Sequence, residues 1–324
     1  MASTKNVTAP LPVVDWRAAG LRYFAYSHYL RGKFGRRVQK VSIDAGFTCP
    51  NVDGTVTTGG CNFCDNRSFS PSRRIPRLKE IRDQIEDGIR RLKWRYDCDD
   101  FIAYFQPATN TYAPVDKLRA LYNEALSHPK VVGLAIGTRP DCVANDVLDL
   151  LQEIAETTYV AVEYGMQTMH DRSLVWMNRG HDHASFLDAV ERSRGRGFEV
   201  CAHLILGISG ESRDDMLATA RELARLPVDA VKIHNLYAVK NTPLGEQVER
   251  GEVQLLDRDT YISTLVDVLE ILPARMVVER ISGDAPPDFF LEPAWCLDKP
   301  AVKMALSAEL ERQDSWQGKS SASL

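Results

Sequence analysis

The sequence predicts an α/β protein in which a parallel sheet is built from strands joined by crossover helices. Two observations lead to this prediction. Short runs rich in β-branched and apolar residues alternate about six times with longer amphipathic stretches. Proline or glycine residues stand at the boundaries between the two kinds of segment. This alternation is typical of a parallel sheet that is either closed toward a (β/α) barrel or doubly wound and open.

Each strand is predicted from its own apolar run. The predicted strands are VQKVSI (38–43), FIAYF (101–105), VVGLAIG (131–137), YVAVEYG (159–165), FEVCAHLILG (198–207), DAVKIHNL (229–236) and the weaker RMVVERI (275–281). The predicted helices are 77–95, 114–127, 144–156, 182–196, 211–225 and 257–271. Both architectures place function on the loops after the strands' carboxyl ends. No Gly-x-Gly-x-x-Gly follows the first strand, which weakens the dinucleotide-binding version.

The segment 16–40 has two interpretations. It carries seven basic residues, no acidic residue and, after Trp16, five further aromatic residues, a mixture suited to phosphate contact and base stacking. The alternative is an amphipathic helix that lays its aromatic side on the main domain. Residues 1–15 and the polar tail 313–324 are expected to be mobile and to carry no chemistry.

Charge is distributed unevenly along the chain. The formal net charge is −4, yet residues 1–95 hold 18 Lys and Arg against 8 Asp and Glu. Such a split can mark a face that binds a polyanion, which keeps RNA in view as a partner. The alternative is that the two parts intermix in space.

Composition excludes several classes of protein. With 44% hydrophobic and 26% charged residues the chain is neither disordered nor collagen-like, and it can bury a sizeable core. No apolar run approaches the roughly 20 residues that span a bilayer, and MASTKNVTAPLPVV is unlike a secretory signal. We expect a cytoplasmic protein without a membrane segment.

Three of the seven cysteines share one glycine-rich loop after the first strand, residues 44–72. Eleven residues separate Cys49 from Cys61, and two separate Cys61 from Cys64. An odd number of cysteines without an export signal argues against a disulfide framework. Glycine-rich backbone lets three thiolates converge, so the loop predicts a metal site.

Ligand number favours iron-sulfur over zinc. A structural zinc site is closed by four protein ligands, and zinc would have to recruit a remote group such as His28, Cys98 or Cys142. A 4Fe-4S cluster held by three thiolates leaves one iron open to a small molecule. Cys98, Cys142, Cys201 and Cys296 are interpreted as ordinary buried thiols.

The motifs of this chain resemble the radical S-adenosylmethionine (SAM) enzymes, in the branch close to the Elongator catalytic subunit and to bacterial proteins of the YhcC and YtqA type. They are KVSIDAGFTCPNVDGT, CNFC, AYFQ, GTRPDC, GMQT, NRGHD and HLILGISGE, and they run in order from about Tyr23 to about Trp295. The resemblance implies a partial (β/α)6 TIM-like barrel with N-terminal and C-terminal helical extensions. It divides the chain into the extension 1–37, the core 38–245, the C-terminal extension 246–312 and the tail 313–324.

The resemblance assigns the metal and catalytic role to Cys49, Cys61 and Cys64. In that family three such cysteines hold a 4Fe-4S cluster, and its open iron chelates SAM. The reduced cluster splits SAM into methionine and a 5′-deoxyadenosyl radical, which abstracts hydrogen from substrate. The chain departs from the commonest loop, which has three residues between the first two cysteines, and a lengthened loop is a mark of the Elongator-like branch.

The resemblance also implies SAM contacts. The residues implied are Glu163, Gln167 and His203 near the ribose, Arg179 at the carboxylate, Ile205 near the adenine, Phe63 in the cysteine loop, and Gln106, beside Tyr104, where related enzymes bind the methionine amine. The Gly-Gly-Glu run that serves the amine elsewhere is absent. For Glu163 the alternative is an ion pair with a neighbouring Lys or Arg, and for Gln167 a helix cap. For Arg179 and His181 the alternative is a solvated loop, and His234 is a substrate contact or a core histidine.

The family points to a tRNA wobble uridine as substrate, with trimming of a carboxymethylaminomethyl side chain to aminomethyl. It also implies a reducing electron donor such as flavodoxin or ferredoxin. Two alternatives remain: radical SAM chemistry on a small metabolite or protein, and a zinc-stabilised RNA-binding module without turnover.

Overall fold

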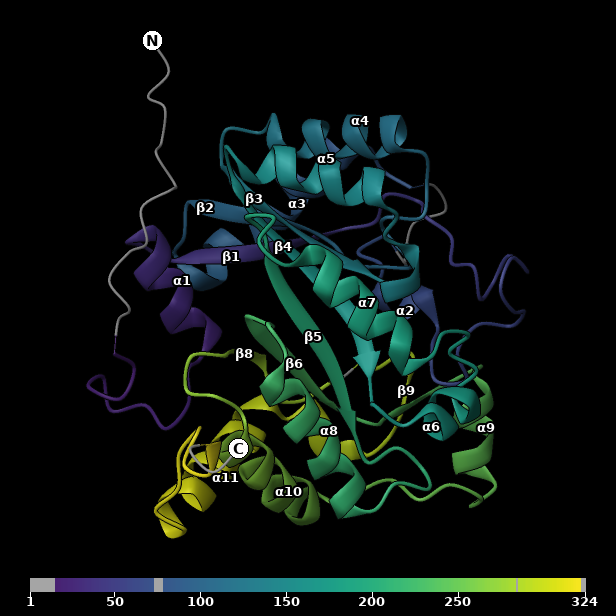
Figure 1. The fold of residues 1–324 in the computed structure, drawn as a ribbon, viewed down its shortest axis with the longest axis vertical. Helices are drawn as coiled ribbons and strands as arrows, with labels where there is room; N and C mark the ends of the chain where they lie inside the picture. The colour runs from purple at the N-terminus through teal and green to yellow at the C-terminus, as the bar shows by residue number, and fades with distance from the viewer. Residues whose placement is uncertain (1–14, 73–77, 284, 322–324) are drawn as a thin grey trace.

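Seven parallel strands form one curled sheet at the centre of the molecule (Figure 1). The computed structural model describes residues 15–72, 78–283 and 285–321. The strands are β1 (Val38–Ile43), β2 (Asp100–Phe105), β3 (Val131–Thr138), β4 (Tyr159–Gln167), β5 (Glu199–Leu206), β6 (Ala230–Asn235) and β8 (Val277–Arg280). They lie side by side in this order and every pair is parallel. The predicted α/β barrel-like fold is therefore confirmed, as an open half-barrel.

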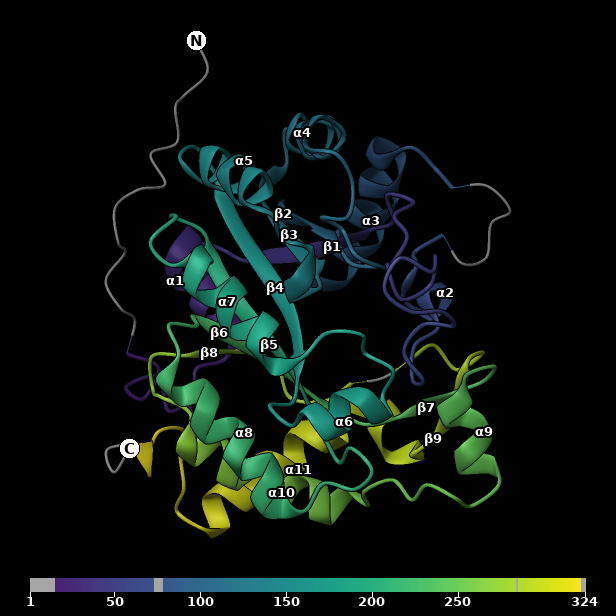
Figure 2. The same cartoon turned by 45° about the vertical axis from the view of Figure 1, so that its right-hand side comes forward.

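The crossover helices cover the outer face of the sheet (Figure 2). They are α3 (Ile81–Tyr96), α4 (Val115–Leu126), α5 (Asn145–Ala155), α7 (His183–Ser193), α8 (Arg213–Arg225) and α10 (Arg258–Ile271). In α5, for example, Val147, Leu151 and Ile154 fall on one stripe and are buried. A capping box between Ser212 and Asp215 starts α8.

Short elements complete the fold. They are α1 (Tyr26–Phe34), α2 (Asn66–Phe69), α6 (Asp171–Trp176), α9 (Pro243–Glu249), α11 (Lys299–Arg312), the 3-10 turns Pro140–Cys142 and Ala294–Leu297, and the antiparallel pair β7 (Ala238–Val239) and β9 (Phe290–Glu292). No helix in the described part of the chain is long and apolar enough to cross a membrane.

The N-terminal segment bridges the first and last strands of the sheet. Ala25 forms a parallel bridge with Val278 of β8, and α1 then leads into β1. The aromatic side chains of this segment pack inward: Phe24 is buried, and Tyr29 and Phe34 lie against the sheet. The helix interpretation holds for Tyr26–Phe34 alone, since residues 38–40 already belong to β1. The aromatic rings pack on the main domain as that interpretation requires, and they are not free to stack on bases.

The uneven charge along the chain is neutralised in part in three dimensions. Lys33 pairs with Glu199 at 2.8 Å, and Arg36 pairs with Asp100. Lys40 reaches Glu163 at 2.7 Å. Basic residues before position 96 thus find acidic partners after it, as the intermixing alternative requires.

The polar tail is better ordered than its composition indicates. Gln317 is fully buried; its amide nitrogen donates to the carbonyls of Pro273 and Met276, both at 2.7 Å. Its amide oxygen accepts a hydrogen bond from the backbone N–H of Phe24 at 2.8 Å. The expectation of mobility is wrong for residues 313–321, because one buried glutamine ties them to the sheet end. Residues 1–14 and 322–324, covered by the same expectation, lie outside the described residues.

Candidate active site

A cavity of about 460 Å³ lies between the cysteine loop and the carboxyl-terminal halves of the strands. Residues of its wall lie within six strands or directly after their ends; the strands are β2, β3, β4, β5, β6 and β8. All ten site residues named from the sequence line it: Cys49, Cys61, Phe63, Cys64, Gln106, Glu163, Gln167, Arg179, His203 and Ile205. The fold therefore brings together side chains that span 157 positions of sequence.

The three thiols of the loop face this cavity. Cys61 is buried, Cys49 and Cys64 are half-buried, and all three are free of disulfides. A tight turn closes the Cys-x2-Cys pair, since the N–H of Cys64 donates to the carbonyl of Cys61 at 3.0 Å. Burial, together with repulsion from the neighbouring Cys61, raises the pKa of the Cys64 thiol. Such a set of desolvated thiols is stabilised as thiolates only by a positively charged partner.

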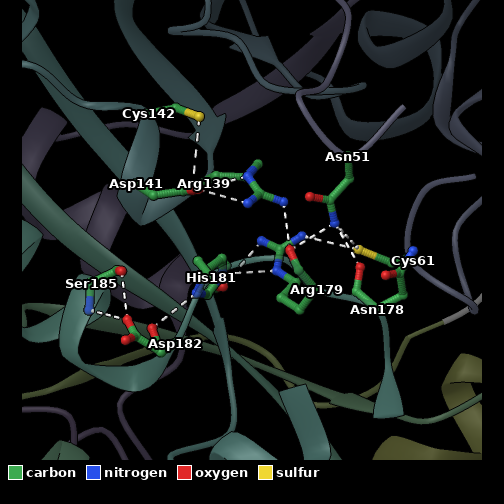
Figure 3. Close-up of polar contacts among 11 residues, drawn as sticks. Asn51, Cys61, Arg139, Asp141, Cys142, Asn178, Arg179, His181, Asp182 and Ser185 are labelled. Atoms are coloured by element: carbon green, nitrogen blue, oxygen red, sulfur yellow. Dashed lines mark hydrogen bonds and ion pairs between the residues drawn. The ribbon is translucent and has the colours of Figure 1, made fainter. Parts of the chain in front are cut away.

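Arg179 contacts the thiol of Cys61, which also accepts from the amide of Asn51 at 3.6 Å (Figure 3). The Nη1 of Arg179 donates to the sulfur of Cys61 at 3.5 Å, and its Nη2 to the carbonyl of Gly165 at 3.1 Å. Its Nε donates to Nε2 of His181 at 3.0 Å. Burial and the nearby guanidinium lower the pKa of His181 to about 3, so the ring is neutral and accepts this bond. A side chain at Gly165 would collide with the guanidinium, which explains the glycine inside β4.

Two buried side chains hold the Arg179 segment in place, and neither has a role assigned from the sequence. The amide nitrogen of Asn51 donates to the carbonyls of Asn178 and Arg179, both at 2.7 Å (Figure 3). Arg139 donates to the same carbonyl of Arg179 at 2.7 Å and forms a two-pronged pair with Asp141. Both residues stand in quoted motifs, GFTCPN and GTRPDC, which is the signal that marked them.

The interior end of the cavity holds a buried cluster of charges around Glu163. One carboxylate oxygen accepts from Lys40 at 2.7 Å; the other accepts from His203 at 2.9 Å and from Lys232. Burial alone would raise the pKa of Glu163, but Lys232 and Lys40 outweigh it and hold that pKa well below its ordinary value. Glu163 is thus an ion-paired strand carboxylate, the alternative to the ribose contact. The sequence signal for this charge cluster was a lysine inside each of the strand-like runs VQKVSI and DAVKIHNL.

The remaining residues that the sequence predicts for the site lie in the cavity wall. Gln106 accepts a hydrogen bond from Ser42 at 2.9 Å. Gln167 ends β4 with a positive φ of 69°, beyond an irregularity in the pairing with β5, and is not a helix cap. Such a backbone conformation is costly for a residue other than glycine and is typical of functional sites. Ile205 and Phe63 belong to one apolar cluster on this wall.

The other cysteines and the remote zinc ligands stand apart. Cys98, Cys201 and Cys296 are buried as expected, and none of them lines the cavity. The expectation of a buried thiol is wrong for Cys142, which is half-buried because it ends the turn after β3; neither it nor His28 lines the cavity. Within residues 15–72, 78–283 and 285–321, no three His, Cys, Asp or Glu side chains converge closely enough to hold a single metal ion. The three free thiols line one cavity, and three thiolates are a donor set that fits a 4Fe-4S cluster with one open iron.

Two family models match the chain. The model for the Radical SAM superfamily matches residues 54–223, and that for the Radical SAM C-terminal domain matches residues 228–312. The protein YtqA of Bacillus subtilis (strain 168) is 42% identical over 92% of each chain.

More distant relatives have names that mention tRNA or Elongator. The tRNA uridine(34) acetyltransferase of Methanocaldococcus jannaschii is 28% identical over 51% of this chain and 30% of that protein. Among solved structures, Elp3 of the archaeon Methanocaldococcus infernus superposes with a TM-score of 0.67 at 18% identity, over 86% of this chain and 64% of that one. The last comparison shows the fold alone. The family model over residues 54–223 covers more than half of the chain, so the chain belongs to the radical SAM superfamily.

Proposed function

We propose that this protein is an enzyme that binds a 4Fe-4S cluster on Cys49, Cys61 and Cys64 and cleaves SAM, and that it trims the carboxymethylaminomethyl side chain of a tRNA wobble uridine to aminomethyl. The observation that carries the first part is the cavity that three free thiols share with Arg179 and the strand-end residues. When bound, the reduced cluster supplies the electron that splits SAM into methionine and a 5′-deoxyadenosyl radical.

Arg179 is suited to bind the carboxylate of SAM. A guanidinium has five N–H donors in a planar fork. Three of them are used by Cys61, Gly165 and His181, which leaves two for a ligand. The bonds already made fix the plane of the fork beside the thiols, so the two free donors are oriented before SAM arrives.

The other wall residues divide the remaining contacts. Gln167 and His203 are proposed to bind the ribose, Ile205 and Phe63 the adenine, and Gln106 the methionine amine. Glu163 keeps its lysine partners. Its two oxygens offer about four acceptor sites; Lys40, His203 and Lys232 occupy three of them, which leaves one for a ribose hydroxyl. A low-potential donor such as flavodoxin or ferredoxin is proposed to reduce the cluster.

Support for tRNA comes from the relatives. Proteins named tRNA uridine(34) acetyltransferase align with half of this chain. The basic segment 16–40 does not add to that support, because its aromatic rings pack on the sheet and several of its cations are paired.

That same packing favours a second candidate function, radical SAM chemistry on a small metabolite or protein. The segment that would contact a large polyanion is occupied in the fold, and the cavity is compact. The two functions differ in substrate and share the site.

The experiment is release of 5′-deoxyadenosine by anaerobically reconstituted protein with SAM and dithionite, with and without tRNA from a strain that accumulates the carboxymethylaminomethyl nucleoside. We expect tRNA to stimulate release and the aminomethyl nucleoside to appear in the digested tRNA. Release that tRNA does not change, with unaltered nucleosides, would contradict the tRNA function and favour the small-molecule one. Zinc in place of iron in the purified protein would contradict the radical SAM proposal itself.

A further inference from the structure

Arg280, the last residue of β8, brings a guanidinium into the interior end of the cavity. It is the register partner of Lys232 on β6, which in turn is the register partner of His203 on β5. All three side chains line the cavity. Three adjacent strands therefore present a row of nitrogen-bearing side chains to the same space.

The charges around Arg280 do not balance within the described residues. Lys40 lies 2.5 Å from Glu279, and Lys232 lies 3.6 Å from it; both lysines also pair with Glu163. Two ammonium groups are thus matched by two carboxylates. No carboxylate of residues 15–72, 78–283 and 285–321 lies within ion-pair distance of Arg280, so one positive charge is left over.

The neighbouring imidazoles do not add charge. Burial, followed by the nearby Arg280, holds the pKa of His234 well below its ordinary value, and burial also lowers that of His203. The Nε2 of His234 is buried and has no hydrogen-bond partner among the described residues. A buried polar atom without a partner is costly, and in a ligand site it indicates a partner that arrives with the ligand.

We propose that Arg280 and His234 form a subsite that binds one carboxylate of the substrate. The guanidinium fork matches a carboxylate in geometry, and a single negative charge neutralises the single unpaired cation. The subsite rests on the proposed function, in which the substrate's side chain carries one carboxylate on the carbon chain to be removed. The subsite supplies the side chains that distinguish the substrate from its trimmed product, because the product lacks the carboxylate.

The carboxylate of SAM is the competing source of the same chemistry. The proposed contact for that group is Arg179, which lies beside Cys61, whereas Arg280 lies beside Lys232 and His234. The two arginines can be separated by experiment, because a change at Arg280 should spare SAM affinity and a change at Arg179 should not.

The experiment compares two synthetic anticodon stem-loops that differ only at the wobble side chain: the carboxymethylaminomethyl acid and its neutral carboxamide. Binding of each to the reconstituted full-length protein with SAM is measured without reductant, and turnover is measured with it. The variants are Arg280→Gln and Arg280→Lys; the matched control is Arg275→Gln, an exposed arginine just before β8. SAM affinity is measured for every variant, and melting temperatures identify any that fold poorly.

We expect the wild type and Arg275→Gln to prefer the acid over the amide by on the order of ten- to a hundredfold, the value of a charge-assisted hydrogen bond. Arg280→Gln should lose that preference by weakening acid binding alone, and Arg280→Lys should keep part of it. SAM affinity should not change.

Three results would overturn the subsite: a wild type that binds acid and amide equally, an Arg280→Gln variant that retains the preference, or one that loses SAM affinity instead. Failure of the proposed function looks different. Preferential binding of the acid through Arg280, without conversion of the nucleoside, would support the subsite and refute the reaction.

Discussion

The guanidinium of Arg179 lies 3.5 Å from the sulfur of Cys61, although the two residues are 118 positions apart in the sequence. This contact joins the cysteine loop to the segment that follows β4. It places a fixed cation beside the thiols and leaves donors free toward the cavity. In the proposed function, cluster retention and SAM binding depend on different atoms of the same neighbourhood, so mutations should separate them.

Replacing Cys61 with Ala should abolish both iron retention and 5′-deoxyadenosine release, because it removes one of the three thiols around the cavity. Iron content, visible absorption and product release are the measurements. Cys98→Ala is the control, since Cys98 is buried away from the cavity. A Cys61→Ala protein that still released 5′-deoxyadenosine would refute the assignment of the cluster.

Replacing Arg179 with Lys should weaken SAM binding by on the order of ten- to a hundredfold while iron content stays the same. Lysine keeps the charge but cannot reproduce the planar fork that contacts Gly165 and His181. Equilibrium binding of SAM and iron analysis on the same preparation test this. Loss of iron instead would mean that Arg179 holds the loop and not the ligand.

Asn51→Ala should destabilise the protein by about 2–3 kcal/mol, because a fully buried amide that bonds the carbonyls of Asn178 and Arg179 would be lost. Chemical denaturation measures the free energy of unfolding. Asn123→Ala, at an exposed position of α4, should change it by less than about 0.5 kcal/mol. Equal effects from the two variants would show that Asn51 does not clamp the loop.

The features that local sequence patterns determine, the strands and the gathering of site residues at their ends, were predicted. The strands follow from apolar runs such as VVGLAIG. Nine of the ten site residues gather because they stand in the cysteine loop or in and just after strands, whose ends meet at one edge of a parallel sheet. The tenth, Arg179, follows α6 in the connection after β4. The weak run 275–281 also became a strand of the main sheet, β8.

The features that the sequence did not predict, the ion pairs between strands and the burial of single side chains, depend on strand register and packing. The pairing of Lys40 with Glu163 and Glu279 joins β1, β4 and β8, and no local pattern states which strands face one another across the half-barrel. Composition likewise did not show that Phe24 would be covered by the sheet end or that Gln317 would be its buried partner. The type of an aromatic or polar residue does not determine whether it faces solvent or the core.

The charge cluster around Glu163 should make stability depend on pH in a defined direction. The pKa of Glu163 is lowered in the folded state. Its ionised carboxylate therefore contributes fully to the free energy of unfolding above the pKa of about 4.3 that Glu has in the unfolded chain, and this contribution is lost as pH falls from there toward the folded-state pKa. Glu163→Gln leaves Lys40 and Lys232 without one shared carboxylate, a loss of about 3–5 kcal/mol at neutral pH. Unfolding free energies measured from pH 7 to pH 3 should therefore converge for wild type and variant on the acid side. The exposed Glu156→Gln should stay close to wild type throughout. A difference that persisted unchanged down to pH 3 would mean that Glu163 acts through packing and not through its charge.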